Sequence, residues 1–272
     1  MGSWVFFSIL GPLEITHGDM PVPFDGARQR AVLGILLLNA NRVVTTASLA
    51  GALWRGDPPP TAGKMVRKAV AEVRTMLSTL STQPRCGPAV VTAPQGYLLR
   101  VAPEQMDLPR FLDQARQARS ALATDPSGRA VRQLRQTLAL SRGPVLADLV
   151  DLGVSSPELR ALEQRRLAVL ESLFDAALCC GRHRDIAGDL EALLEKDRTT
   201  ERLIGQCMLA FYRSGRQLDA LNVYRRTRAA FVRSHCREPG RELRELHLAI
   251  LNQASALDWV RRPLAVAVGM SA

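Results

Sequence analysis

The sequence predicts an α+β domain over residues 1–102, an all-α domain over residues 103–260 and a short C-terminal tail over residues 261–272. Apolar residues alternate at period two in two places within the first domain, which is typical of β-strands. Three stretches with helical periodicity lie between those places. The second domain contains only amphipathic helical stretches, separated at most boundaries by glycine or proline.

The strand signals lie at both ends of the first domain. Apolar residues alternate on both sides of Gly11-Pro12, which predicts a hairpin or a short antiparallel sheet (Val5, Phe7, Ile9, Leu13 and Ile15). A second pair of strands is predicted over Ala89–Thr92 and Tyr97–Val101, with residues 93–96 as the turn.

Three helices are predicted between the two strand pairs. The first covers Arg28–Asn39. A short second helix begins where Thr45 or Thr46 can cap it. The third covers Thr61–Leu80 and follows three prolines, a residue type that is tolerated at the start of a helix.

The third helix has one apolar side and one basic side. The apolar side follows a period of 3.6 residues (Val66, Ala69, Val70, Val73, Leu77 and Leu80). The other side combines cations with short side chains (Lys64, Arg67, Lys68, Ala71, Arg74 and Thr75). Such a helix has the shape and charge to enter a DNA major groove, although a solvated cationic face is the alternative. The order of strands, three helices and hairpin favours DNA binding, because it is the layout of a winged helix-turn-helix.

Composition supports a polyanionic partner and argues against a membrane-spanning or secreted protein. The net charge is +10 and the isoelectric point is about 10.2. The only lysines are Lys64, Lys68 and Lys196, and two of them fall in the third helix. No apolar stretch is long enough to span a membrane, and the apolar N-terminus lacks the features of a signal peptide. We therefore expect a cytoplasmic protein with no membrane partner.

The sequence offers no catalytic, metal or cofactor site. Its five cysteines form no CxxC pair, and its four histidines lack the spacing of metal ligands. Gly63-Lys64 resembles the end of a phosphate-binding loop, but three prolines precede it and Met65 follows. We expect neither enzymatic activity nor a cofactor.

The second domain shows signs of an internal repeat. Gly181-Arg182 recurs as Gly215-Arg216, a spacing of thirty-four residues, and neighbouring positions match across the same shift. That is the period of tetratricopeptide-like helix pairs, which bury their apolar faces against one another and bind proteins or ligands. An all-α, tetratricopeptide-like domain is therefore expected.

The chain resembles the Streptomyces antibiotic regulatory protein family. The resemblance rests on the runs FSILGPLEI, GARQRAVLGILLLNANRVVT, LAGALWRGDPPPTA and PQGYLLRV in the first domain. In the second it rests on LSRGPVLADL, AALCCGRHRDIAGDLEALLEKD, RLIGQCMLAFYRSGRQLDALNVYRRTR and EPGRELRELHLAIL. It implies an OmpR-type winged helix joined to a bacterial transcriptional activation domain. Members bind direct repeats upstream of antibiotic biosynthetic genes and recruit RNA polymerase holoenzyme near the −35 region.

The resemblance also implies which residues meet the DNA. The recognition helix would be Thr61–Leu80, with Lys64, Arg67, Lys68 and Arg74 as candidate contacts and Thr61 at its start. The start of the first helix would face the phosphate backbone through Arg28, Gln29 and Arg30. The wing tip around Gln95 and Gly96 would lie along the minor groove. Two protomers, in tandem or as a dimer, would occupy adjacent repeats.

Two positions depart from the family pattern. Pro94-Gln95 replaces a basic residue that is common in the wing, and Ser141 stands where the family often has tryptophan. We expect no receiver domain. The activity of the protein would then be controlled by how much of it is made or by a ligand of the helical domain.

The main alternative is a helical-repeat adaptor that binds proteins and has incidental basic charge. A repressor also remains open, and an RNA-binding role is disfavoured by the 5% aromatic content.

Overall fold

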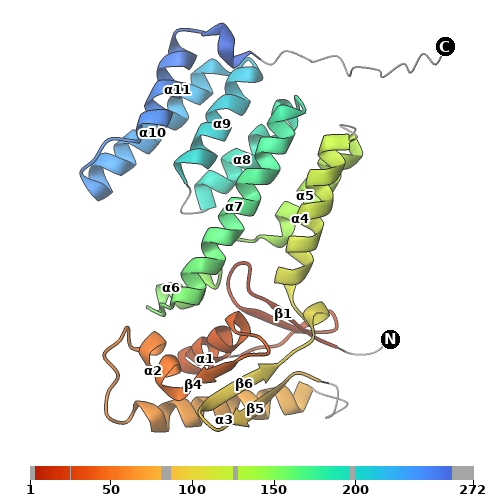
Figure 1. The fold of residues 1–272 in the computed structure, drawn as a ribbon, viewed down its shortest axis with the longest axis vertical. Coiled ribbons are helices and arrows are strands. Elements are labelled where there is room, and N and C mark those ends of the chain that lie inside the picture. The colour runs from red at the N-terminus through yellow and green to blue at the C-terminus, as the bar shows by residue number, and fades with distance from the viewer. Residues whose placement is uncertain (1–3, 25, 81–86, 125–127, 197–199, 259–272) are drawn as a thin grey trace, which may run out of the picture. The chain divides into compact units, whose positions relative to one another are not determined.

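The chain folds into two compact units, seen here in a computed structural model (Figure 1). The structure describes residues 4–24, 26–80, 87–124, 128–196 and 200–258. The N-terminal unit comprises residues 1–121 and 132–170, and the C-terminal unit comprises residues 122–131 and 171–272. Residues 107–121 and 132–170 therefore fold together with the first hundred residues. The sequence instead predicted a domain boundary after residue 102.

The first sheet of the N-terminal unit confirms the predicted hairpin. Strands β1 (Val5–Ser8), β2 (Glu14–His17) and β3 (Met20–Pro21) pair antiparallel in the order β1-β2-β3. Phe7 lies opposite Ile15, and both are buried. The sequence did not predict β3, because two exposed residues carry no alternation that could reveal a strand.

The three predicted helices are confirmed. They are α1 (Ala27–Leu38), α2 (Thr46–Leu53) and α3 (Ala62–Leu80). The Thr45 hydroxyl accepts a hydrogen bond from the backbone N–H of Ser48 at 3.0 Å and so caps α2. Five of the six residues predicted for the apolar side of α3 are buried (Val66, Ala69, Val70, Val73 and Leu77), whereas Leu80 is only half-buried. Ala62, at the start of the helix, is buried as well.

The second sheet packs beside α3 (Figure 1). Strands β4 (Val43–Thr45), β5 (Ala89–Ala93) and β6 (Gly96–Arg100) pair in the order β4-β6-β5. The β5–β6 hairpin was predicted, whereas the three-residue β4 was not. Gly96 lies opposite Thr45, and a Cβ atom on Gly96 would collide with the carbonyl oxygen of Val44. A glycine is therefore required for β4 and β6 to pair at this distance.

Residues 142–155, which we call the strap, fasten later sequence onto the first hundred residues. The backbone N–H groups of Arg142 and Leu146 donate to the carbonyl oxygens of Leu10 and Ile9 at 2.8 and 3.0 Å. Helix α6 (Ala147–Asp151), which the sequence analysis did not predict, forms within the strap. These contacts explain why residues 142–155 belong to the N-terminal unit.

Asp148 is the centre of the strap's polar contacts. One carboxylate oxygen accepts the backbone N–H of Leu13 at 2.9 Å, and the other accepts the guanidinium of Arg30 at 2.5 and 3.1 Å. Both side chains of this ion pair are about one-quarter exposed, at 26% and 24%. Asp148 therefore ties the β1–β2 turn and the first turn of α1 to α6.

A second carboxylate secures the turn after β1. Asp107, the first residue of α4 (Asp107–Thr124), accepts the backbone N–H groups of Ile9 and Leu10 at 2.8 and 2.9 Å. Burial raises the pKa of this carboxyl, while the two amides and the Arg142 guanidinium act in the opposite direction. The same short segment after β1 is thus held by both α4 and the strap.

Ser141 has a polar role in this fold. Its hydroxyl accepts a hydrogen bond from the fully buried Arg166 guanidinium at 2.8 Å, just after α5 (Gly128–Leu140). The same guanidinium pairs with Glu163, whose carboxylate also accepts the N–H of Val145. A serine at position 141 therefore provides a partner for a buried charge, which an indole ring, as a donor only, could not provide.

The described residues of the C-terminal unit are mostly helical, and the helical stretches predicted there are confirmed. Its elements are the later part of α7 (Pro157–Cys179), α8 (His183–Lys196), α9 (Glu201–Arg213), α10 (Gln217–His235), α11 (Arg241–Leu251) and the 3-10 turn Ser255–Leu257. Helix α9 is the most buried of them and contacts both α8 and α10. Within the described parts of the chain, no helix combines the length and apolar character needed to cross a membrane.

The two Gly-Arg turns have the same geometry. Gly181 and Gly215 adopt φ values of 71° and 79°, a conformation that glycine adopts without a steric penalty. The N–H groups of Arg182 and Arg216 each donate to the carbonyl five residues earlier at 2.9 Å. Each arginine also pairs with the aspartate three residues later. The repeat found in the sequence therefore corresponds to two structurally equivalent helix–helix turns.

We expect Asp148→Ala to lower the free energy of unfolding by about 2–3 kcal/mol, because the Leu13 amide and the Arg30 guanidinium both lose their partner. Urea unfolding of the full chain measures this. Asp151→Ala, on the same helix but exposed, is the matched control and should change stability little. Equal effects of the two variants would contradict the role given to Asp148.

We expect Gly96→Ala to destabilise the N-terminal unit by about 2 kcal/mol, because the added methyl group forces β4 away from β6. Gly63→Ala is the control, since only the Arg67 guanidinium lies near that position, at 3.8 Å, and helix propensity favours alanine. Thermal unfolding compares the two. A stable Gly96→Ala variant would show that the strand pairing tolerates a side chain.

Candidate nucleic-acid interface

The solvent side of α3 is the most clearly formed part of the candidate site. Lys64, Arg67 and Lys68 are all exposed, as the sequence predicted. Among the described residues, Lys64 and Arg67 have no ion-pair partner. Lys68 lies 3.8 Å from Glu72, with side-chain exposures of 79% and 37%, and such an exposed pair contributes little to stability. These charges are therefore available to an external anion.

Short side chains lie among these cations. Ala71 and Thr75 are exposed on the same side of the helix. The Thr75 hydroxyl donates to the carbonyl oxygen of Ala71 at 3.1 Å and so bonds the helix's own backbone. Because neither residue projects far, the middle of this face can approach a surface closely while the longer Lys and Arg side chains reach outward.

The start of α1 lies beside this face. Arg28 is exposed, and the side-chain amide of Gln29 donates to a carboxylate oxygen of Glu72 at 2.6 Å. Residues Gly26–Gln29 and α3 together line a groove of about 390 Å³, and Met65 and Lys68 are among the α3 residues that line it. The structure therefore places Arg28 and Gln29 beside Lys68, a proximity that the sequence did not predict.

Arg30 is not part of that face. Its guanidinium pairs with Asp148 and donates to the carbonyl oxygens of Leu13 and Phe24 at 2.7 and 3.2 Å. The expectation that Arg30 faces a phosphate backbone conflicts with these four hydrogen bonds within the unit, because they occupy its donors. The sequence could not reveal this, since Asp148 is 118 residues away along the chain.

Arg74 joins α3 to the β5–β6 hairpin. It donates to the carbonyl oxygen of Val90 at 2.9 Å and to the hydroxyl of Thr92 at 2.6 Å. Its guanidinium also lies 5.7 Å from the centroid of the Tyr97 ring. Arg74 therefore fixes the position of the hairpin relative to α3, and it does not project freely like Lys64.

The remaining predicted residues lie at turns. Thr61 is exposed just before α3, and its carbonyl oxygen accepts the N–H groups of Lys64 and Met65. Gln95 is exposed at the tip of the β5–β6 hairpin. Gly96 is buried beneath β4, so its position reflects strand pairing and not exposure to a ligand.

Glu72 was not among the site residues predicted from the sequence. It is the one acidic residue in α3, and its carboxylate joins the Gln29 amide to the cationic face. Its spacing of four residues from Lys68 was a visible signal of an i,i+4 contact. Its contact with α1 needed the tertiary structure.

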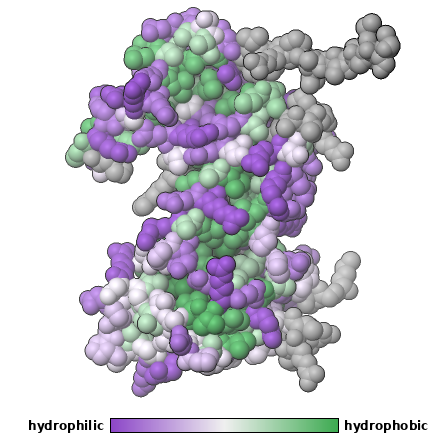
Figure 2. Space-filling model, in the orientation of Figure 1, coloured by the Kyte–Doolittle hydropathy of each residue, from purple (hydrophilic) through white to green (hydrophobic). Residues whose placement is uncertain are grey.

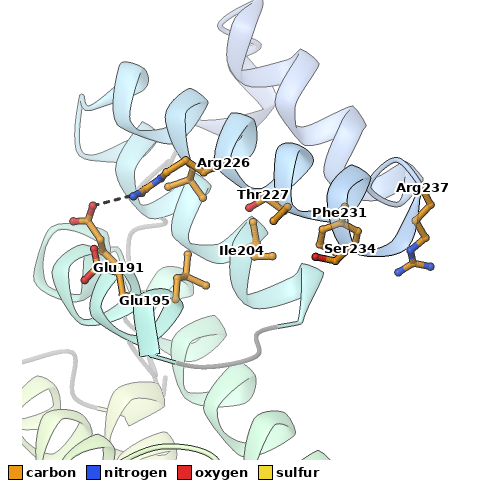
Figure 3. A pocket seen from close by; sticks show the side chains of 11 residues that line it. Glu191, Glu195, Ile204, Arg226, Thr227, Phe231, Ser234 and Arg237 are labelled. Carbon is orange, nitrogen blue, oxygen red and sulfur yellow. Dashed lines mark ion pairs between the residues drawn. The ribbon is translucent and has the colours of Figure 1, made fainter.

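The C-terminal unit contains a groove of its own, lined by α8, α9 and α10 and measuring about 870 Å³ (Figure 3). Its floor is apolar and includes Ile204 and Phe231. Glu191 and Arg226 face one another near one end, 3.9 Å apart, and Arg237 lies near the other end, over the Phe231 ring at 5.4 Å. Hydrophilic and hydrophobic areas also alternate on the visible surface of this unit (Figure 2). An apolar floor with charged edges suits a protein ligand.

Comparisons with known proteins agree with this architecture. The family model described as "Bacterial transcriptional activator domain" matches residues 106–251, more than half of the chain. The chain is 35% identical over 247 residues to the transcriptional regulatory protein EmbR of Mycobacterium tuberculosis, covering 91% of this chain and 63% of that protein. It is 32% identical to the regulatory protein DnrI of Streptomyces peucetius, covering 92% and 93%. The chain thus spans less than two thirds of EmbR but nearly all of DnrI.

A solved structure shows the same fold. The chain superposes on Mycobacterium tuberculosis EmbR, determined in complex with a low-affinity phosphopeptide, with a TM-score of 0.68 at 34% identity. The match covers 93% of this chain and 66% of that one. The chain therefore belongs to the Streptomyces antibiotic regulatory protein family of transcriptional activators, and carries that family's bacterial transcriptional activator domain.

Proposed function

We propose that this protein binds promoter DNA in a sequence-specific manner through a winged helix-turn-helix formed by α1 to α3 and the β5–β6 hairpin. In this proposal α3 enters the major groove with its exposed side. The observation that carries the proposal is the exposed face of Lys64, Arg67 and Lys68 on a helix whose opposite side is buried. Release of counterions from the neutralised phosphates supplies much of the affinity.

The contacts divide by position. Arg28 and the backbone N–H groups in the first turn of α1 meet the phosphate backbone, because a helix N-terminus attracts anions. Gln95 at the hairpin tip lies along the minor groove. Arg74 positions the hairpin, and Arg30 positions α1 through Asp148. Gly96 allows the hairpin to pair with β4.

Activation rests on the helical part of the chain. Two protomers, bound in tandem to direct repeats near the −35 region of genes for antibiotic or secondary-metabolite synthesis, present their C-terminal units to RNA polymerase holoenzyme. The groove between α8 and α10 is the surface that we assign to this contact, because its apolar floor and charged edges resemble a protein-binding surface.

The triple variant Lys64→Ala, Arg67→Ala, Lys68→Ala should lose specific DNA binding and reduce the dependence of log K on log salt by up to about 2.7, since each lost phosphate contact removes about 0.9. Fluorescence anisotropy across salt concentrations and footprinting measure both effects. The control Arg225→Ala, Arg233→Ala, Arg244→Ala removes the same charge from the C-terminal unit. If the first variant stays folded and still binds the DNA tightly, α3 is not the recognition helix, and the result would favour a protein-binding adaptor.

Ala230→Arg should abolish activation while leaving DNA binding unchanged, because the exposed Ala230 lines the groove and a bulky cation would fill it. Transcription in vitro with RNA polymerase holoenzyme measures activation. Ala229→Arg is the matched control, since the neighbouring Ala229 is also exposed but does not line the groove. Full activation by Ala230→Arg would exclude the groove as the polymerase contact.

A further inference from the structure

Helix α3 carries a single carboxylate on a face otherwise made of cations and short side chains. Glu72 lies at the edge of that face nearest α1, and 37% of its side chain is exposed. A negative charge at this position repels DNA phosphates and so lowers general affinity. Its presence therefore calls for a physical reason other than electrostatic attraction to DNA.

Support of the helix is a weak reason. The contact between Lys68 and Glu72 is 3.8 Å long, and an exposed i,i+4 pair stabilises a helix by only about 0.3–0.5 kcal/mol. The order of the two residues is also the less favourable one, because glutamate stabilises a helix more when it precedes the lysine. The ion pair alone does not account for Glu72.

The two carboxylate oxygens of Glu72 have different surroundings. Oε2 accepts the Gln29 amide at 2.6 Å, which holds the carboxylate in place. Oε1 has the Lys68 ammonium at 3.8 Å, beyond hydrogen-bonding distance. Glu72 also lines the groove of about 390 Å³ between α1 and α3. Among the described residues, no donor lies within hydrogen-bonding distance of Oε1, so this fixed carboxylate keeps one acceptor available beside the proposed DNA-binding face.

The major groove contains few groups that could donate to such an acceptor. Guanine presents only acceptors there, which lysine and arginine can bind. The exocyclic amino groups of cytosine and adenine are the donors, and carboxylates pair with cytosine N4. An acceptor held beside a row of donors therefore reads a different base from the one its neighbours read.

We propose that Glu72 is a specificity-determining residue that accepts a hydrogen bond from the N4 amino group of one cytosine in the operator. The inference rests on the proposed DNA-binding function and adds to it a means of rejecting other bases at one position. At that base pair, guanine or thymine would place an oxygen acceptor against the carboxylate, and the complex would be weakened.

The test begins with selection of preferred sites by the wild-type protein from a random duplex library. Dissociation constants are then measured by fluorescence anisotropy for all four base pairs at each position, with wild type, Glu72→Ala and Glu72→Gln. Glu104→Gln, exposed and outside α3, controls for the loss of one negative charge.

We expect Glu72→Ala to lose about tenfold discrimination for cytosine at one position while the preferences elsewhere persist. Glu72→Gln should shift that position toward adenine, because an amide pairs with adenine N6 and N7. It has nearly the same shape as glutamate and keeps an oxygen for Gln29, so it serves as the folded variant if alanine destabilises the unit.

Two other results would overturn the inference. A uniform gain of affinity at all positions, with unchanged base preferences, would show that Glu72 acts only through its charge. If the wild-type protein selects no sequence at all, the proposed DNA-binding function fails as well. These results are distinct, because the first retains a wild-type operator and the second does not.

Discussion

The contact between Asp148 and the start of α1 is the constraint on which the N-terminal unit depends. One carboxylate satisfies the Leu13 amide and the Arg30 guanidinium and thereby joins the first sheet, α1 and the strap. Backbone hydrogen bonds from Arg142 and Leu146 reinforce the same junction. The family's activator domain begins near residue 106, so part of that domain completes the fold of the residues before it.

This junction also decides which cations are available to a ligand. Sequence alone treats Arg28, Arg30 and Arg74 as equivalent basic residues beside a candidate DNA surface. In the fold, Arg30 bonds the strap and Arg74 bonds the β5–β6 hairpin, whereas Arg28 remains exposed. Because a guanidinium that already has carboxylate or carbonyl partners would have to give them up to bind phosphate, the free cations are the better candidates.

The two units supply different kinds of surface. The N-terminal unit presents a convex, cationic helix, which suits the groove of a charged duplex. The C-terminal unit presents a groove with an apolar floor, built from helices whose turns repeat with the same geometry. An activator needs both a DNA contact and a protein contact, and the two surfaces that we propose for them lie on separate elements of the fold.

The sequence by itself determined the helices other than α6, both hairpins, the spacing of the repeat and the cationic face of α3, because periodicity and turn residues are local signals. Only the tertiary structure decided that Arg30 serves Asp148, that Gly96 is buried under β4, that Ser141 partners Arg166 and that Glu72 meets Gln29. These contacts join residues far apart in the chain. The elements β3, β4 and α6 were missed for another reason, because each is too short to leave a periodic pattern in the sequence. Long-range pairing leaves no signature in one sequence, since either partner alone is an ordinary polar residue.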